Sequence, residues 1–266
     1  MSATDPAAVR LFVQEFGEGP PVLVLHGLLG QGRNWGAIGR RLARGRRVLL
    51  VDLRNHGRSP HHPVMTYTAM ARDLEELIRS RGLASPSMVG HSMGGKAAMT
   101  LALRRPGLLG RLAVVDVAPV DYGASELFAG HLRAMLAVDP GRLGRRAEAE
   151  AALAGAVADP RIRAFLASNL ELVDGRLAWL PNLGVLLGAL ATIGGFPSDQ
   201  TPVGADLPVL AIAGGRSDYV GPAGIAELRR LFPAVRLVSV PEAGHWVHAD
   251  APEAVLEALE GFLPAG

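Results

Sequence analysis

Short apolar runs recur along the chain, and most lead through a loop into a segment with helical periodicity. The runs predict strands at residues 22–26, 47–52, 87–90, 112–116, 208–213 and 235–240, with helices between them. Consecutive rather than alternate positions are apolar, so both faces of each strand must be covered. The pattern therefore predicts an α/β fold with a mostly parallel central sheet flanked by helices.

Residues 119–202 interrupt this alternation. The segment is rich in Ala and Leu at helical spacing and offers no convincing strand pattern. It predicts an inserted helical cap on a core made of residues 1–118 and 203–266. Leu183 and Leu187 lie in its most apolar stretch, and we expect them to contact the substrate in an apolar pocket.

The motif Gly90-His91-Ser92-Met93-Gly94 lies between a predicted strand and a predicted helix. A serine on a sharp strand-to-helix turn needs small neighbours, because strand and helix approach closely there. Such a turn exposes the Ser92 hydroxyl and directs the Met93 N–H, at a helix N-terminus, toward a developing oxyanion. The motif therefore predicts a nucleophilic serine.

A second glycine-rich loop, His26-Gly27-Leu28-Leu29-Gly30, follows the first predicted strand. In this architecture the loop supplies the other oxyanion donor, which we expect to be the Leu28 N–H. A dinucleotide-binding turn is the alternative, since Asp52 ends the next strand. The glycine spacing does not match that fingerprint, and it disfavours a nucleotide site.

A nucleophilic serine needs a base, and His245 follows the last predicted strand, with His248 as a nearby rival. We expect His26, His91 and Trp246, which adjoin these motifs, to contact the substrate. The cluster His56, His61 and His62 has no carboxylate at ligand spacing, so no metal site is predicted.

Several extended motifs resemble the α/β-hydrolase superfamily, and more narrowly small bacterial serine esterases akin to the mitochondrial abhydrolase-domain protein eleven. The matching segments are residues 26–28, 52–61, 90–96, 116–122 and 244–249. The resemblance implies a cofactor-free serine esterase with an acyl-enzyme intermediate, acting on short-to-medium acyl esters. Dehalogenases and epoxide hydrolases of this fold carry an aspartate at the strand-to-helix turn where this chain has Ser92, so the resemblance does not extend to those enzymes.

The acid that orients the histidine has two candidates. Asp218 follows the strand at 208–213, the usual position in this fold, whereas the narrower resemblance implies Asp116, after the strand at 112–116. We favour Asp116, because its sequence context matches that family closely. Thioester hydrolysis, C–C bond hydrolysis and perhydrolysis remain alternative activities, as does a non-catalytic binding role.

Composition and charge limit the partners and the chemistry that we expect for this chain. The formal net charge of +2 argues against a nucleic-acid partner, and the absence of cysteine excludes thiolate chemistry. No targeting segment or membrane span is evident, so we expect a cytoplasmic protein that binds a small acyl ester. Lys96 is the only lysine beside many arginines. It lies one helical turn beyond Ser92, where a compact ammonium suggests a role that arginine cannot fill. The alternative is an ordinary lysine on the solvated surface of the helix.

Overall fold

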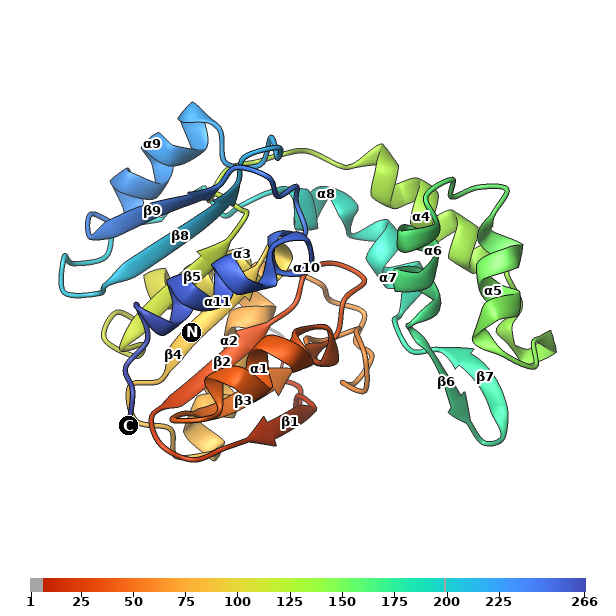
Figure 1. Ribbon diagram of the computed structural model, residues 1–266, viewed down its shortest axis with the longest axis horizontal. Coiled ribbons are helices and arrows are strands. Elements are labelled where there is room, and N and C mark those ends of the chain that lie inside the picture. The colour runs from red at the N-terminus through yellow and green to blue at the C-terminus, as the bar shows by residue number, and fades with distance from the viewer. Residues whose placement is uncertain (1–6, 199) are drawn as a thin grey trace.

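The computed structural model describes residues 7–198 and 200–266. These form a seven-stranded sheet in the order β1-β3-β2-β4-β5-β8-β9, in which only β1 is antiparallel to its neighbour (Figure 1). The strands are β1 Val13–Phe16, β2 Pro21–Leu25, β3 Arg47–Val51, β4 Ser87–His91, β5 Arg111–Val115, β8 Val209–Gly214 and β9 Val235–Val240. The predicted fold class, α/β with a mostly parallel sheet, is confirmed. The sequence of β1, Val13-Gln14-Glu15-Phe16, has two polar residues at its centre and so contains no apolar run, and this edge strand was missed.

Helices cover both faces of the sheet. They are α1 Gly36–Leu42, α2 Tyr67–Ser80, α3 Met93–Arg104, α9 Pro222–Leu231, α10 Val247–Asp250 and α11 Pro252–Glu260. Leu23 and Leu25 of β2 belong to the core cluster that includes α2 and α3, whereas Val22 and Val24 belong to the cluster that includes α1 and α11. Successive residues of one strand thus fill opposite cores, which explains the continuous apolar runs.

The described residues of 119–202, called the inserted segment below, carry helices that lie to one side of the sheet (Figure 1). Their helices are α4 Glu126–Ala137, α5 Arg146–Leu153, α6 Pro160–Ala167, α7 Leu183–Gly188 and α8 Leu190–Gly194, with a short 3-10 helix at Pro140–Arg142. The prediction that this segment contains no strand is wrong. β6 Leu170–Val173 and β7 Arg176–Trp179 form an antiparallel hairpin, joined by the tight turn Asp174-Gly175.

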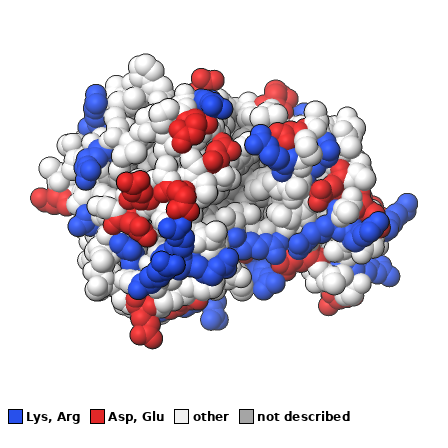
Figure 2. Space-filling view, in the orientation of Figure 1, with Lys and Arg blue, Asp and Glu red and all other residues white. Residues whose placement is uncertain are grey.

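Hydrogen bonds and ion pairs fasten the inserted segment to the core. The Asn169 side chain donates to the Leu29 carbonyl at 2.9 Å. Glu171 pairs with two core arginines, Arg33 at 2.8 Å and Arg58 at 2.9 Å. Figure 2 shows acidic and basic side chains interspersed over one face of the molecule, with a hollow between the core and the inserted segment. No helix within the described residues is long and apolar enough to cross a membrane.

Candidate active site

Ser92 occupies a strained turn between β4 and α3. Its φ of 51° and ψ of −119° lie outside the regions that residues with a side chain prefer. A Cβ at Gly90 would lie 2.5 Å from the Gly94 carbonyl oxygen, and one at Gly94 would lie 2.5 Å from the His26 carbonyl oxygen. Both glycines are therefore required for the close packing that presents the serine at the edge of the sheet.

Three side chains from different strand ends form a hydrogen-bonded chain. His245 Nε2 lies 3.0 Å from Ser92 Oγ, and His245 Nδ1 lies 2.7 Å from Asp116 Oδ2. A carboxylate can only accept, so Nδ1 carries the proton and donates it to Asp116. This leaves a lone pair on Nε2, which accepts the hydrogen bond from the Ser92 hydroxyl. The arrangement prepares the serine for deprotonation.

Asp116 is fully buried and is held by donors besides the histidine. It accepts a 2.9 Å hydrogen bond from the Gly214 N–H and another from the Ser217 hydroxyl. Its φ of 50° directs the chain sharply away from the end of β5. Asp218 lies in the turn after β8 with its side chain exposed. Of the two predicted acids, the structure brings Asp116 to His245.

Tyr219, which follows Asp218 in the chain, stacks on the imidazole of His245 with ring centroids 3.9 Å apart. Burial raises the pKa of the Tyr219 hydroxyl, and the Asp116 carboxylate raises it further. Sequence reasoning missed both Ser217 and Tyr219. Their only signal was proximity to Asp218, since the turn was examined for a carboxylate alone.

Buried neutral histidines shape the loop that carries Leu28. His26 Nε2 accepts from the Leu53 N–H at 3.0 Å, and His56 Nε2 accepts from the Leu29 N–H at 3.2 Å. Burial lowers the pKa of His26 to about 4 and that of His56 to about 3. Both rings therefore remain neutral at pH 7 and can accept from the backbone. Leu28, Ser92 and Met93, which the sequence predicts as oxyanion donors and nucleophile, line one cavity.

This first cavity, of about 50 Å³, is largely apolar. It is lined by Leu28, Tyr67, Ser92, Met93, Lys96, Val117, Tyr122, Ser125, Phe128, Leu190, Ile193, Gly194 and Tyr219. From the apolar stretch around Leu183, the lining includes Leu190 and Ile193 but neither of the predicted contacts, Leu183 and Leu187. Leu183 is instead buried in the main core, and Leu187 packs against that core half-buried.

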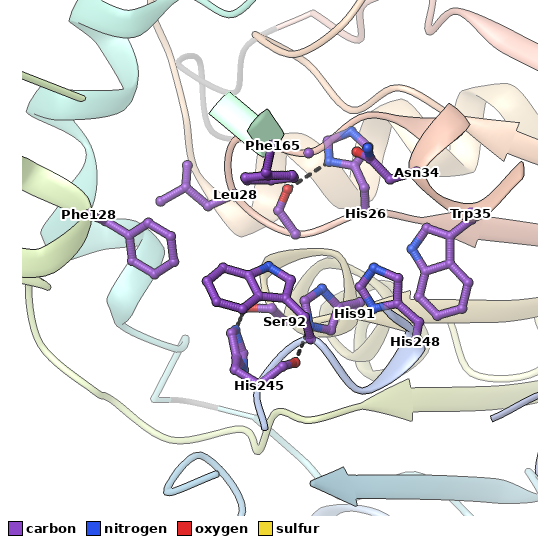
Figure 3. Close-up of a pocket in the computed structure, with 13 residues that line it drawn as sticks. His26, Leu28, Asn34, Trp35, His91, Ser92, Phe128, Phe165, His245 and His248 are labelled. Atoms are coloured by element: carbon purple, nitrogen blue, oxygen red, sulfur yellow. Dashed lines mark hydrogen bonds between the residues drawn. The ribbon is translucent and has the colours of Figure 1, made fainter. Parts of the chain in front are cut away.

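A second cavity, of about 20 Å³, adjoins Ser92 and has a more polar lining than the first (Figure 3). It is lined by His26, Gly27, Leu28, Gly30, Asn34, Trp35, His91, Ser92, Phe128, Phe165, His245, Trp246 and His248. The predicted substrate contacts His26, His91 and Trp246 all lie here. Several of these residues also border a larger opening of about 490 Å³ between α6 and α10.

His248, the rival base, lies away from Ser92. Its ring stacks on Trp35 at 4.4 Å and contacts His91 at 4.7 Å. His91 Nε2 in turn donates to the His245 carbonyl at 2.8 Å. The aspartate considered for a nucleotide, Asp52, accepts from the backbone of Gly32 and Arg58 and so joins two loops.

Lys96 is 2% exposed, contrary to an interpretation as a solvated helix residue. Its ammonium donates to the carbonyls of Val120, Gly194 and Gly195 at 2.8, 2.5 and 2.8 Å. It also lies 4.3 Å from the ring centroid of Tyr122. Burial lowers the pKa of Lys96 to about 7, although nearby Asp121 acts in the opposite direction.

Known proteins resemble this chain in sequence and in fold. Residues 20–252 match the family described as alpha/beta hydrolase fold. The sn-1-specific diacylglycerol lipase ABHD11 of Mus musculus is 42% identical over 92% of this chain and 81% of its own length. Esterase YbfF of Escherichia coli (strain K12) is 37% identical over 91% of this chain and 92% of its own. A solved structure, a marine microorganism esterase, superposes with a TM-score of 0.92 at 36% identity, covering 96% of this chain and 100% of that chain. The resemblance read from the motifs is confirmed, and the chain belongs to the α/β-hydrolase family.

Proposed function

We propose that this protein is a serine carboxylesterase that hydrolyses short-to-medium acyl esters through an acyl-enzyme intermediate. The observation that carries the proposal is the hydrogen-bonded chain from Ser92 through His245 to Asp116. Relatives named as esterases and a lipase support ester hydrolysis as the general activity.

In the first half-reaction, Ser92 Oγ attacks the ester carbonyl carbon while His245 Nε2 takes its proton. The N–H groups of Leu28 and Met93 bind the oxyanion that forms. The buried Asp116 carboxylate stabilises the imidazolium without itself becoming protonated. When the tetrahedral intermediate collapses, the alcohol oxygen receives the proton from Nε2 and leaves.

In the second half-reaction, a water molecule attacks the acyl-enzyme and His245 removes its proton. The resulting oxyanion forms at the same donors, and its collapse releases the acid and returns the proton to Ser92. The acyl chain occupies the apolar cavity, because that cavity contains both oxyanion residues and the side chains of Leu190 and Ile193. Residues 119–202 thus act as a helical cap that sets acyl selectivity on a core of residues 1–118 and 203–266.

The test combines kinetics with active-site labelling. Ser92→Ala should reduce kcat on p-nitrophenyl butyrate by about a millionfold and abolish labelling by a fluorophosphonate probe. The matched control is Ser80→Ala, at the end of α2, which should leave rate and labelling unchanged. Activity of Ser92→Ala within tenfold of the parent protein would refute the serine mechanism.

A further inference from the structure

His91, the residue before the nucleophile, has a ring nitrogen that the mechanism above does not use. Its Nε2 donates to the His245 carbonyl at 2.8 Å. A carbonyl only accepts, so Nε2 carries the proton, and a neutral ring then has a lone pair on Nδ1. Burial lowers the pKa of His91 well below 6.5, which keeps the ring neutral at pH 7. Nδ1 can therefore only accept a hydrogen bond.

No donor reaches His91 Nδ1 from the described part of the chain, yet the atom is not sealed inside the protein as Trp35 Nε1 and His248 Nδ1 are. A Cβ at Gly27 would lie 2.9 Å from Nδ1 and 3.2 Å from the Cβ of Ser92. Gly27 does not have a positive φ, so its own backbone conformation does not require glycine. The absence of a side chain at this position instead leaves His91 Nδ1 and Ser92 facing the same space.

That space belongs to the second cavity, whose lining includes Gly27, His91, Ser92 and His245 (Figure 3). Its volume of about 20 Å³ accommodates one water molecule. His245 Nε2, the base in the proposed mechanism, lies 3.0 Å from Ser92 Oγ, and the ring centroids of His91 and His245 are 4.9 Å apart. This separation allows one water molecule to form hydrogen bonds of ordinary length with both rings.

Water and alcohols differ in what they can donate here. The nucleophile that attacks the acyl-enzyme gives one proton to His245 Nε2 while its oxygen bonds to the acyl carbon. The bond from that carbon to Ser92 Oγ then breaks, and Ser92 regains the proton. Water has a second O–H group, which can donate to His91 Nδ1 and stays on the released carboxylic acid. An alcohol has one O–H group only, so it has nothing left to donate to His91.

We propose that His91 Nδ1 accepts a hydrogen bond from the water that attacks the acyl-enzyme, and thereby favours water over alcohols as the nucleophile. This inference rests on the proposed esterase function and adds a residue that determines the specificity of its second half-reaction. His245 serves both nucleophiles, so the contribution of His91 is measured by the ratio of the two products.

The experiment measures how the butyryl-enzyme divides between methanol and water. Each protein receives p-nitrophenyl butyrate in the same methanol–water mixture, and methyl butyrate and butyrate are quantified by gas chromatography. In His91→Gln the amide reaches the position of Nε2, and the acceptor at Nδ1 is lost. This variant should raise the ratio of methyl butyrate to butyrate three- to tenfold, roughly the effect of one hydrogen bond.

Two further variants serve as controls. His91→Asn keeps an acceptor oxygen near the position of Nδ1 and loses the donor to the His245 carbonyl, so it should keep the parent ratio at a lower kcat. His61→Gln makes the same substitution at an exposed histidine that lines neither cavity, and it should leave the ratio unchanged.

An unchanged ratio in His91→Gln would overturn the proposal. A rise of equal size in His91→Asn would overturn it too, because the hydrogen bond to the His245 carbonyl would then control the ratio. If His91→Gln does not fold, as judged by circular dichroism, His91→Leu decides, since it also lacks the acceptor and its lost donor affects both nucleophiles equally. Release of p-nitrophenolate reports formation of the acyl-enzyme separately, so a parent protein that releases none would refute the esterase function itself.

Discussion

Lys96 donates a 2.5 Å hydrogen bond to the carbonyl of Gly194, linking α3, the helix that follows Ser92, to the last turn of α8. The neighbouring Ile193 carbonyl accepts from the Tyr67 hydroxyl at 2.5 Å. α8 contributes Leu190 and Ile193 to the wall of the apolar cavity. The depth of that cavity is therefore fixed by core side chains that reach the end of α8.

Removing the Lys96 ammonium should allow α8, which forms this wall of the cavity, to move away from the core. We expect Lys96→Met to lower the free energy of unfolding by about 2 kcal/mol, since three buried carbonyls lose their donor. It should also move the preference for p-nitrophenyl esters toward longer acyl chains. Lys96→Arg should not restore either property, because a planar guanidinium cannot match three carbonyls arranged around a tetrahedral nitrogen. Arg79→Met, in an exposed ion pair, is the control for urea denaturation and should change stability by less than about 0.5 kcal/mol.

The cavity wall can also be altered directly. Leu190→Ala or Ile193→Ala should increase kcat/KM for hexanoate relative to butyrate, by about fourfold for each additional methylene buried. Leu187→Ala is the control, because Leu187 lies on the same segment outside the cavity lining. An unchanged chain-length profile in both cavity variants would show that acyl selectivity resides elsewhere.

The two candidate acids should differ strongly in kinetics. Asp116→Asn should reduce kcat by about 10⁴-fold, because an amide no longer holds the histidine in its productive tautomer or stabilises the imidazolium. Asp218→Asn changes an exposed turn residue and should stay within a few-fold of the parent. One activated ester, measured with both variants at pH 8, is sufficient. The opposite ranking would assign the role to Asp218.

Buried histidines make the fold sensitive to acid. The pKa of His26 and of His248 is about 4 in the folded chain, below the ordinary value of 6.5. Between these values the unfolded chain binds protons that the folded chain does not, so stability falls as pH decreases from 6.5 toward 4. Each group contributes on the order of 3 kcal/mol to this loss. His248→Phe should flatten urea-derived stability against pH, whereas substitution of the exposed His61 by Gln should not.

Much of the fold followed from local pattern, because strands buried on both faces leave an unmistakable apolar run. Ser92 and His245 could likewise be identified from the sequence, since each lies in a short motif next to a strand. The hairpin β6–β7 was missed although Asp174-Gly175, a typical two-residue hairpin turn, separates its strands. The surrounding helical spacing masked that signal.

The choice of acid could not be made from local pattern. Asp116 reaches His245 because its backbone turns at the end of β5 and because Gly214 and Ser217 of a neighbouring strand and turn bind its carboxylate. Those are contacts between residues far apart in sequence. The stacking of Trp35 on His248 is hidden for the same reason, since the two rings meet only in the folded chain.

Asn169 and Glu171 tie the inserted segment to the core beside the site. The opening between α6 and α10 is lined by His245, the residue that takes the proton from Ser92 in the proposed mechanism. That opening shares Trp246 and His248 with the polar cavity. In that mechanism the alcohol lies nearest this opening when its bond to the acyl group breaks. Its departure would clear the same passage for the water that completes the turnover, while the acyl group remains in the apolar cavity on the other side of the serine.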